Sequence, residues 1–286
     1  MQMKRLAIYA HFGSSAQVAG YVLFYLEKIA EIGFRICFVT NSGISTSSEI
    51  ALKKTCERII VRENTGLDFS MWQRGLAEYE MAQWDELLLT NSSIIGPLQQ
   101  LDPLWHNPAL LDCDFWGLTE QDKVASHLQS YFLVFRSNVI RSECFKRFWS
   151  AVLPYRSKDL VIHSYEIGIS SWLEQHGFRK KAVFPQQLVL NCYRQRVFPR
   201  TYMGRAVRLL KGCKASNYLK ERNTTWYYPD ILHELGMPFL KCSLLKGRLG
   251  ERIQPSWAYE KLREAAFPVA AIDELRAMYS HDYYNV

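Results

Sequence analysis

The sequence predicts an α/β fold with a mostly parallel sheet, because strand-like and helix-like segments alternate from residue 6 to residue 97. The strand-like segments are apolar runs at residues 6–10, 35–39, 58–61 and 86–89, and each ends in a cluster of polar residues. The carboxyl ends of parallel strands meet at one edge of a sheet, and ligands of open α/β sheets bind outside that edge. We therefore expect a small-molecule site there.

Amphipathic helices are expected between these strands. They are residues 18–29, with an N-cap at Ser14 or Ser15 and a stop at Gly33; residues 49–57, capped by Ser47 or Ser48; and a helix through Trp72, Leu76 and Tyr79, capped by Asp68 or Ser70. Right-handed crossovers between parallel strands turn this order into a doubly wound half-domain.

The pattern becomes mixed after Pro97. Further strands are expected at residues 114–118, 129–135 and 181–184, and further helices at residues 145–152, 166–176 and 272–279. We divide the chain into a domain of residues 1–193 and a basic, mostly helical C-terminal extension of residues 194–286.

Composition limits the class of protein. A hydrophobic content of 48% in 286 residues is typical of a globular chain, and no run approaches the ~20 apolar residues of a membrane-spanning helix. The N-terminus leads directly into a strand without a long apolar leader, so we expect a cytoplasmic protein. The seven cysteines form no CxxC pair, which favours reduced thiols over a disulfide framework or a zinc site.

The net charge of +7 is concentrated in one segment, since residues 194–222 hold nine basic residues against Glu221 alone. Within it, residues 203–211 have the amphipathic pattern of a helix that can lie on an anionic membrane. A solvated face or an arginine cluster facing a diphosphate is the alternative. The candidate arginines are Arg194, Arg196, Arg205 and Arg208. We expect no nucleic-acid partner.

Common nucleotide-binding and nucleophile motifs are absent: there is no GxxxxGKS/T, no GxGxxG after the first strand and no GxSxG. The polar loops remain. Gly66 permits a close backbone approach, and Asp68 then stands at a helix N-terminus beside a phosphate site, or serves only as an N-cap. Residues 91–97 follow the fourth strand, where transferases using sugar nucleotides place acidic residues for a divalent ion. Those carboxylates are missing here, and a plain polar turn is the alternative.

Seven segments together carry a resemblance to a known family. They are residues 9–11, 64–69, 91–97, 114–119, 127–132, 165–168 and 238–241. In this order they resemble the rhamnan synthesis F (RgpF-like) proteins, glycosyltransferases of bacterial cell-surface polysaccharide assembly. The resemblance implies a GT-A-like fold and transfer of a sugar, often rhamnose, from a nucleotide donor to a growing glycan.

The resemblance also implies a nucleotide-sugar site at the sheet edge, for a donor such as dTDP-rhamnose. Its expected binding residues are His11, Asn64, Gly66, Asp68, Asn91, Ser92 and Ser93. The family usually has Asn-Asp-Ser where this chain has Asn91-Ser92-Ser93, so a hydroxyl replaces the carboxylate expected to bind Mg²⁺ or Mn²⁺. A divalent metal cofactor is therefore doubtful, and catalysis itself is in question.

An inverting transfer needs a base for the acceptor hydroxyl and a positive group for the leaving diphosphate. Glu166 matches the family's Tyr-Glu box and is the candidate base, with Asp114 and His127 as alternatives. The competing interpretation is that Glu166 only favours a helix start. His127, Gln129 and Tyr131 suggest a polar face that binds the acceptor.

The expected acceptor is a lipid-linked saccharide, which places the protein peripherally at the inner face of the plasma membrane. The alternative function is a non-catalytic glycan- or nucleotide-binding subunit of a polysaccharide-assembly complex.

Overall fold

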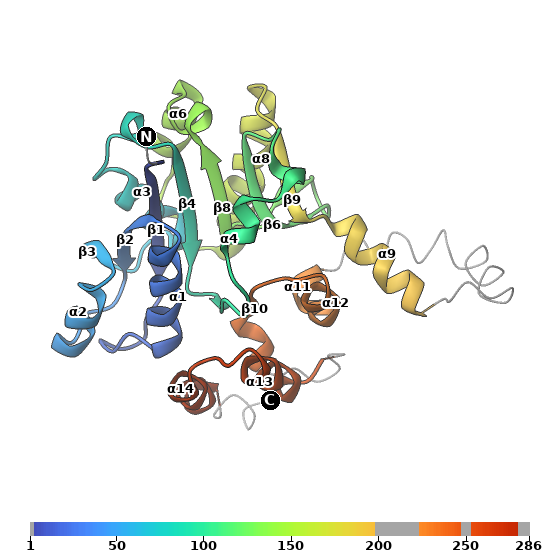
Figure 1. Cartoon of the computed structure of the whole chain (residues 1–286). Helices are drawn as coiled ribbons and strands as arrows, with labels where there is room; N and C mark the ends of the chain where they lie inside the picture. Colours follow the sequence, from blue (N-terminus) through green and yellow to red (C-terminus); the bar gives the residue numbers. More distant parts are fainter. Residues whose placement is uncertain (1–2, 198–222, 247–252, 280–286) are drawn as a thin grey trace, which may run out of the picture.

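The computed structural model describes residues 3–197, 223–246 and 253–279, and a single eight-stranded sheet forms its centre (Figure 1). The strands are β1 (Arg5–His11), β2 (Phe34–Thr40), β3 (Cys56–Val61), β4 (Glu86–Asn91), β5 (Ile94–Ile95), β6 (Phe115–Gln121), β7 (His127–Leu128), β8 (Phe132–Arg136), β9 (Lys180–Phe184) and β10 (Leu240–Lys241). The order in the main sheet is β3-β2-β1-β4-β8-β6-β7, and β9 also pairs with β6. Strands β1 to β4 are parallel, whereas β8 is antiparallel to both β4 and β6.

Helices cover the sheet. They are α1 (Gly20–Glu31), α2 (Thr46–Leu52), α3 (Leu67–Leu76), α4 (Asp102–Trp105), α5 (Ser137–Ile140), α6 (Glu143–Ser150), α7 (Lys158–Val161), α8 (Ile167–Gln175), α9 (Gln186–Val197), α11 (Thr224–Tyr227), α12 (Pro229–Glu234), α13 (Pro255–Glu264) and α14 (Val269–Tyr279). Short helical turns are η1 (Met81–Gln83), η2 (Pro108–Leu110), η3 (Ile162–Glu166) and η4 (Cys242–Leu245). The prediction of an α/β fold with a mostly parallel sheet flanked by helices is confirmed: a parallel half, β1 to β4, joins a mixed half, β6 to β9.

The side chains of β1 alternate between two hydrophobic cores, one on each face of the sheet. Ala7 and Tyr9 belong to the core that includes α1 and the C-terminal helices, whereas Leu6, Ile8 and Ala10 belong to the core that includes α3, α6 and α8. All five side chains are fully buried. A strand buried on both faces must be apolar throughout, which explains the continuous apolar runs of the sequence.

The order of the strands creates a switch point between β1 and β4. From β1 the chain continues to β2 and β3 on one side, and then returns to β4 on the other side. In register, His11 lies beside Thr40 and Ala10 lies beside Asn91, so the carboxyl ends of β1, β2 and β4 are neighbours. Open α/β sheets bind their ligands at such a point.

The C-terminal part packs against this edge. Strand β10 pairs antiparallel with β5, and α14 packs on α1, where Glu274 accepts a hydrogen bond of 2.6 Å from the Gly20 backbone N–H. In Figure 1, α13 and α14 lie beyond the carboxyl ends of the parallel strands. The division at residue 193 falls inside α9 and stays a prediction.

Several element boundaries differ from the sequence expectation. The first helix has Ala19 as its N-cap, the second begins at Thr46 after Ser45, the third has Gly66 as its N-cap, and the strand expected at residues 129–135 is broken between β7 and β8. Ser14 and Ser15 do not cap α1, because their loop runs along the carboxyl edge of the sheet before the helix starts. The helix expected at residues 203–211 lies outside the described residues.

Candidate functional site

A cleft of about 1100 Å³ opens at the carboxyl edge of β1 and β4. Five residues expected to bind the nucleotide line it: His11, Asp68, Asn91, Ser92 and Ser93. Glu166, Gln129 and Tyr131 line it as well. Segments from both halves of the sheet therefore converge on one cavity, which is large enough for a small-molecule ligand.

A chain of hydrogen bonds crosses the end of β4. The Asn91 amide nitrogen donates to Asp68 Oδ2 at 2.9 Å, and Asn91 Oδ1 accepts from the Ser93 hydroxyl at 2.6 Å. Lys241 Nζ donates to the same hydroxyl oxygen at 3.1 Å. These bonds fix the orientation of the Asn91 amide and connect α3, β4 and β10.

Asp68 lines the cleft from the first turn of α3. The N-cap of this helix is Gly66, so the interpretation of Asp68 as the cap is wrong. Burial raises the pKa of Asp68 to about 6, although Lys241 and Asn91 act in the opposite direction. The Asp68 carboxylate is ionised at neutral pH at a cost in free energy, which a ligand that donates hydrogen bonds would reduce.

Glu166, at the end of η3, is held by hydrogen-bond donors. Ser130 donates to Oε2 from its backbone N–H at 3.0 Å and also from its hydroxyl. His127 Nε2 lies 3.6 Å from Oε1, and His127 Nδ1 donates to the Ala125 carbonyl oxygen at 2.7 Å. Burial acts to raise the pKa of Glu166, but the neighbouring His127 and the hydrogen bonds from Ser130 outweigh it and bring the pKa below its usual value. Glu166 is therefore ionised at neutral pH.

The three residues expected to contact the acceptor divide into two groups. The Thr119 hydroxyl donates a hydrogen bond to Gln129 Oε1 at 2.7 Å and shares another with the Tyr131 hydroxyl at 2.6 Å. These bonds fix the Gln129 and Tyr131 side chains at the cleft wall. His127 is only 4% exposed and does not line the cleft. It lies behind Glu166, so direct contact of His127 with an acceptor is not supported.

His11 and Ser92 organise the loop that follows β1. His11 Nδ1 bonds to Thr40 Oγ1 at 2.9 Å, and burial lowers the pKa of His11 to about 4, so the ring is neutral at pH 7. The Ser92 hydroxyl accepts from the Phe12 backbone N–H at 3.1 Å. Ser92 therefore supports the loop where its family relatives are expected to present a carboxylate.

Two expected binding residues do not line the cleft. Asn64 is exposed in the loop before α3. Gly66 is buried and adopts the left-handed conformation, with φ +73°, that turns the chain into α3. A Cβ atom at Gly66 would lie 1.9 Å from Ser70 Oγ and 2.6 Å from Pro154 Cα. Gly66 therefore lets the backbone turn into α3 and pack closely against Ser70 and Pro154, and this turn places Asp68 in the cleft lining.

Gly66→Ala is expected to lower the free energy of unfolding by about 2–5 kcal/mol, because the left-handed conformation costs ~1–2 kcal/mol and overpacking adds ~1–3 kcal/mol. Gly33→Ala is the matched control: its φ is +88°, yet nothing lies within 4 Å of its Cβ position. That variant should lose only the conformational part. Urea denaturation compares the two, and equal losses would contradict a packing role for Gly66.

Asp114, the alternative base, lies at the opposite edge of the sheet. It precedes β6, which runs in the direction of β4 because both are antiparallel to β8. Its carboxylate accepts hydrogen bonds of 2.7 Å from the Arg179 backbone N–H and from the Asn138 amide. Asp114 therefore connects surface segments and does not line the cleft, and its role as a base stays a prediction that this position does not favour.

The two described arginines that the sequence analysis singled out, Arg194 and Arg196, do not line the cleft either. Arg196 pairs with Asp230 at 2.8 Å and with Glu234, which holds α9 against α12. Arg194 also lies on α9, away from the cleft lining. Arg205 and Arg208 lie outside the described residues. Their expected contact with diphosphate or membrane stays a prediction.

Sequence reasoning missed the lysines of the cleft lining, among them Lys158 at the start of α7 and Lys241 in β10. Neither makes an ion pair within 4 Å in the described part of the chain. For Lys241, the sequence pattern that points to the site is its place in the family-like segment 238–241. No sequence pattern points to Lys158 as a residue of the cleft.

Among residues 3–197, 223–246 and 253–279, no group of three or more His, Cys, Asp and Glu side chains is arranged to hold a metal ion. Within the same ranges, no helix has the length and hydropathy required to cross a membrane.

Comparison with known proteins identifies relatives of this chain. The model of the family described as rhamnan synthesis protein F matches residues 36–213. Virulence protein VirA of Vibrio anguillarum is 26% identical over 169 residues, which are 57% of this chain and 53% of VirA. The uncharacterized protein y4gN of Sinorhizobium fredii is 24% identical over 175 residues, 59% of this chain and 46% of y4gN. The chain thus spans about half the length of these curated relatives.

Solved structures resemble the chain only distantly. The 4-diphosphocytidyl-2C-methyl-D-erythritol synthase from Anaerococcus prevotii has a TM-score of 0.40 at 12% identity, over 63% of this chain and 86% of that one. The inositol-1-phosphate CTP transferase from T. maritima has a TM-score of 0.38 at 14% identity, over 63% of this chain and 85% of that one.

The family match extends from β2 through α9 and covers more than half of the sequence. The chain belongs to the rhamnan synthesis protein F family.

Proposed function

We propose that this protein is a glycosyltransferase that moves a sugar from a nucleotide-sugar donor to a glycan in bacterial surface polysaccharide synthesis. Membership of the rhamnan synthesis protein F family supports this function. The observation that carries it is the cleft at the switch point, where Asp68, Asn91 and Glu166 come together from three separate segments.

The donor, a dTDP-rhamnose-like nucleotide sugar, binds over the carboxyl edge of β1 and β4. Asp68 accepts hydrogen bonds from donor hydroxyl groups, which are the natural partners of an ionised carboxylate. Phe12 lines the same cleft with 57% of its surface exposed and offers an aromatic face to the base. The diphosphate then lies nearer the end of β4.

Glu166 acts as the general base. The acceptor oxygen forms a bond to the anomeric carbon of the donor sugar while the bond from that carbon to the diphosphate oxygen breaks. The electron pair leaves with the diphosphate, and the hydroxyl proton passes to Glu166. His127 is a positioning residue, because its Nδ1 proton is fixed on the Ala125 carbonyl and its Nε2 faces Glu166 Oε1.

The acceptor is a lipid-linked saccharide that enters beside Gln129 and Tyr131. Two fixed polar side chains at the cleft wall support a sugar-binding face there. The protein acts in the cytoplasm at the inner face of the plasma membrane, which residues 203–211 contact through Arg205 and Arg208. The basic, amphipathic sequence of that segment supports the contact.

A non-catalytic binding subunit is the second candidate, favoured by the serine at position 92. The glycosyltransferase requires the cleft to bind a nucleotide sugar, whereas a subunit that binds only glycan does not, and a thermal-shift screen of dTDP-, UDP- and GDP-sugars tests this requirement. A ligand at about 100 times its Kd adds about 2.7 kcal/mol of stability. Failure of every nucleotide sugar to raise Tm would contradict the glycosyltransferase and leave the glycan-binding subunit standing.

Asp68→Asn is expected to weaken donor binding by about 10–100-fold, since a hydrogen bond to a charged group contributes about 1.5–3 kcal/mol. The folded-state pKa of Asp68 is raised above its unfolded value, so its ionisation destabilises the fold increasingly as pH rises from about 4 through about 6, and by a constant amount at higher pH. Without donor, the variant should therefore be more stable than the wild type at pH 8 and gain little at pH 3. Calorimetry measures donor affinity, and urea denaturation at pH 8 and pH 3 measures stability. A variant that is stabilised at pH 8 but binds the donor as tightly as the wild type would contradict the role of Asp68 in donor binding.

A further inference from the structure

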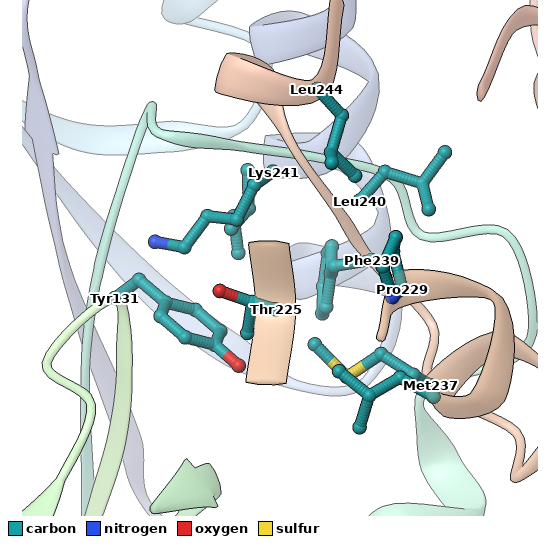
Figure 2. A pocket seen from close by; sticks show the side chains of 10 residues that line it. Tyr131, Thr225, Pro229, Met237, Phe239, Leu240, Lys241 and Leu244 are labelled. Atoms are coloured by element: carbon teal, nitrogen blue, oxygen red, sulfur yellow. The ribbon is translucent and has the colours of Figure 1, made fainter. Parts of the chain in front are cut away.

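Lys241 brings a positive charge to the end of β4 from a distant part of the sequence. It lies in β10, where it is in register with Ile94 of β5. Its Nζ is 3.1 Å from Ser93 Oγ and 3.9 Å from the centre of the Tyr131 ring, within the range of a cation–π interaction. Figure 2 shows the ammonium group reaching towards Tyr131 and away from the apolar side chains Phe239, Leu240 and Met237.

No carboxylate of the described residues directly contacts the Lys241 ammonium group. It makes no ion pair within 4 Å among the described residues, although Asp68 and Glu166 are near enough to affect its pKa. Burial lowers the pKa of Lys241 to about 8, so most molecules keep the charge at pH 7. A partly desolvated cation is stabilised by an anion that enters the same cavity.

The oxygen atoms at this edge do not suit a divalent ion. Such ions require several oxygen ligands, mainly carboxylates. Glu166 Oε2 is occupied by two donors from Ser130, and the Asp68 carboxylate accepts from Asn91. Ser93 Oγ already accepts from Lys241, whose charge would repel a metal at that place.

We propose that Lys241 binds the diphosphate of the donor and supplies at the end of β4 the positive charge that a divalent ion would otherwise provide. Ser93 and Tyr131 orient the ammonium group, and Lys158 adds a second cation to the cleft lining. Because Lys241 lies in β10, the C-terminal part of the chain contributes this cation to the cleft. This inference rests on the proposed function, because it requires a nucleoside diphosphate in the cleft.

The test is calorimetric titration of dTDP and thymidine into the wild type and Lys241→Met, with EDTA and with Mg²⁺. Methionine keeps the apolar stem and removes the charge. The variant should bind dTDP about 10–100-fold more weakly, as expected for loss of a charged hydrogen bond, and bind thymidine unchanged. The wild type should bind dTDP equally well with EDTA. Lys181→Met, which removes an exposed lysine paired with Asp112 outside the cleft, is the control for net charge.

The outcomes separate the two proposals. Unchanged dTDP affinity in a folded Lys241→Met variant, or loss of wild-type affinity on chelation, overturns the role of Lys241 and leaves the proposed function standing. A wild type that binds neither dTDP nor UDP nor GDP overturns both. If the methionine variant does not fold, Lys241→Gln, which can still hydrogen-bond Ser93, replaces it in the same titration.

Discussion

Glu166→Gln is expected to reduce sugar transfer by about 10²–10⁴-fold, the usual contribution of a general base, while the donor stays bound. The amide is nearly isosteric with the carboxylate, and its oxygen can still accept from the backbone N–H of Ser130, which Glu166 Oε2 does at 3.0 Å. It cannot accept the proton of the acceptor hydroxyl. The measurement is the turnover number together with donor affinity for both forms.

Glu143→Gln is the control for this variant. It removes one negative charge from an exposed carboxylate that pairs with Lys146 on α6, away from the cleft. Its turnover should equal that of the wild type. Near-normal turnover in Glu166→Gln would contradict the role of Glu166 as the base. Asp68, which is hydrogen-bonded to Asn91 at the end of β4, would then be the candidate, because Asp114 lies at the opposite edge of the sheet.

Trp72→Ala is expected to lower the free energy of unfolding by about 3–5 kcal/mol, as is typical for loss of a buried tryptophan. Trp72 is fully buried between α3 and the sheet, with its ring edge-on to Phe69 at 5.0 Å between centroids. Its Nε1 donates to the Thr90 carbonyl oxygen at 3.0 Å. The substitution removes both the packing and this hydrogen bond beneath the cleft.

Trp72→Phe distinguishes the two contributions, because it keeps an aromatic ring and loses the donor. Leu111→Ala is the surface control: Leu111 is 69% exposed, and its loss should change stability by less than about 0.5 kcal/mol. Urea denaturation measures all three. A loss below about 1 kcal/mol for Trp72→Ala would contradict the packing of α3 on the sheet.

The strands could be predicted from the sequence because both faces of the sheet are buried. Residues 6–10 of β1 and 87–89 of β4 are apolar throughout, and the two strands lie side by side, so their polar ends meet as expected. The sequence also predicts Asp68 at the start of the third helix, and the structure has it there. The helix that follows a parallel strand starts at the carboxyl edge of the sheet, so its first turn faces the cleft.

Local patterns failed where tertiary contacts decide the outcome. Ser93 and Lys241 are 148 residues apart in the sequence, and only the pairing of β10 with β5 brings them together. The strand expected at residues 129–135 is interrupted because the Ser130 backbone N–H donates to Glu166. Arg196 has the positive charge that a diphosphate ligand needs, but its guanidinium group already pairs with the carboxylates of Asp230 and Glu234.

The most direct test of the proposed function is mass-spectrometric analysis of the products formed from dTDP-rhamnose and a lipid-linked saccharide. We expect the wild type to release dTDP and to lengthen the saccharide by one sugar in equal amounts, and Glu166→Gln to do neither within the same time. Wild-type protein that binds nucleotide sugars in the cleft but, given these and UDP- and GDP-sugars, forms no lengthened saccharide would contradict catalysis and identify a binding subunit instead.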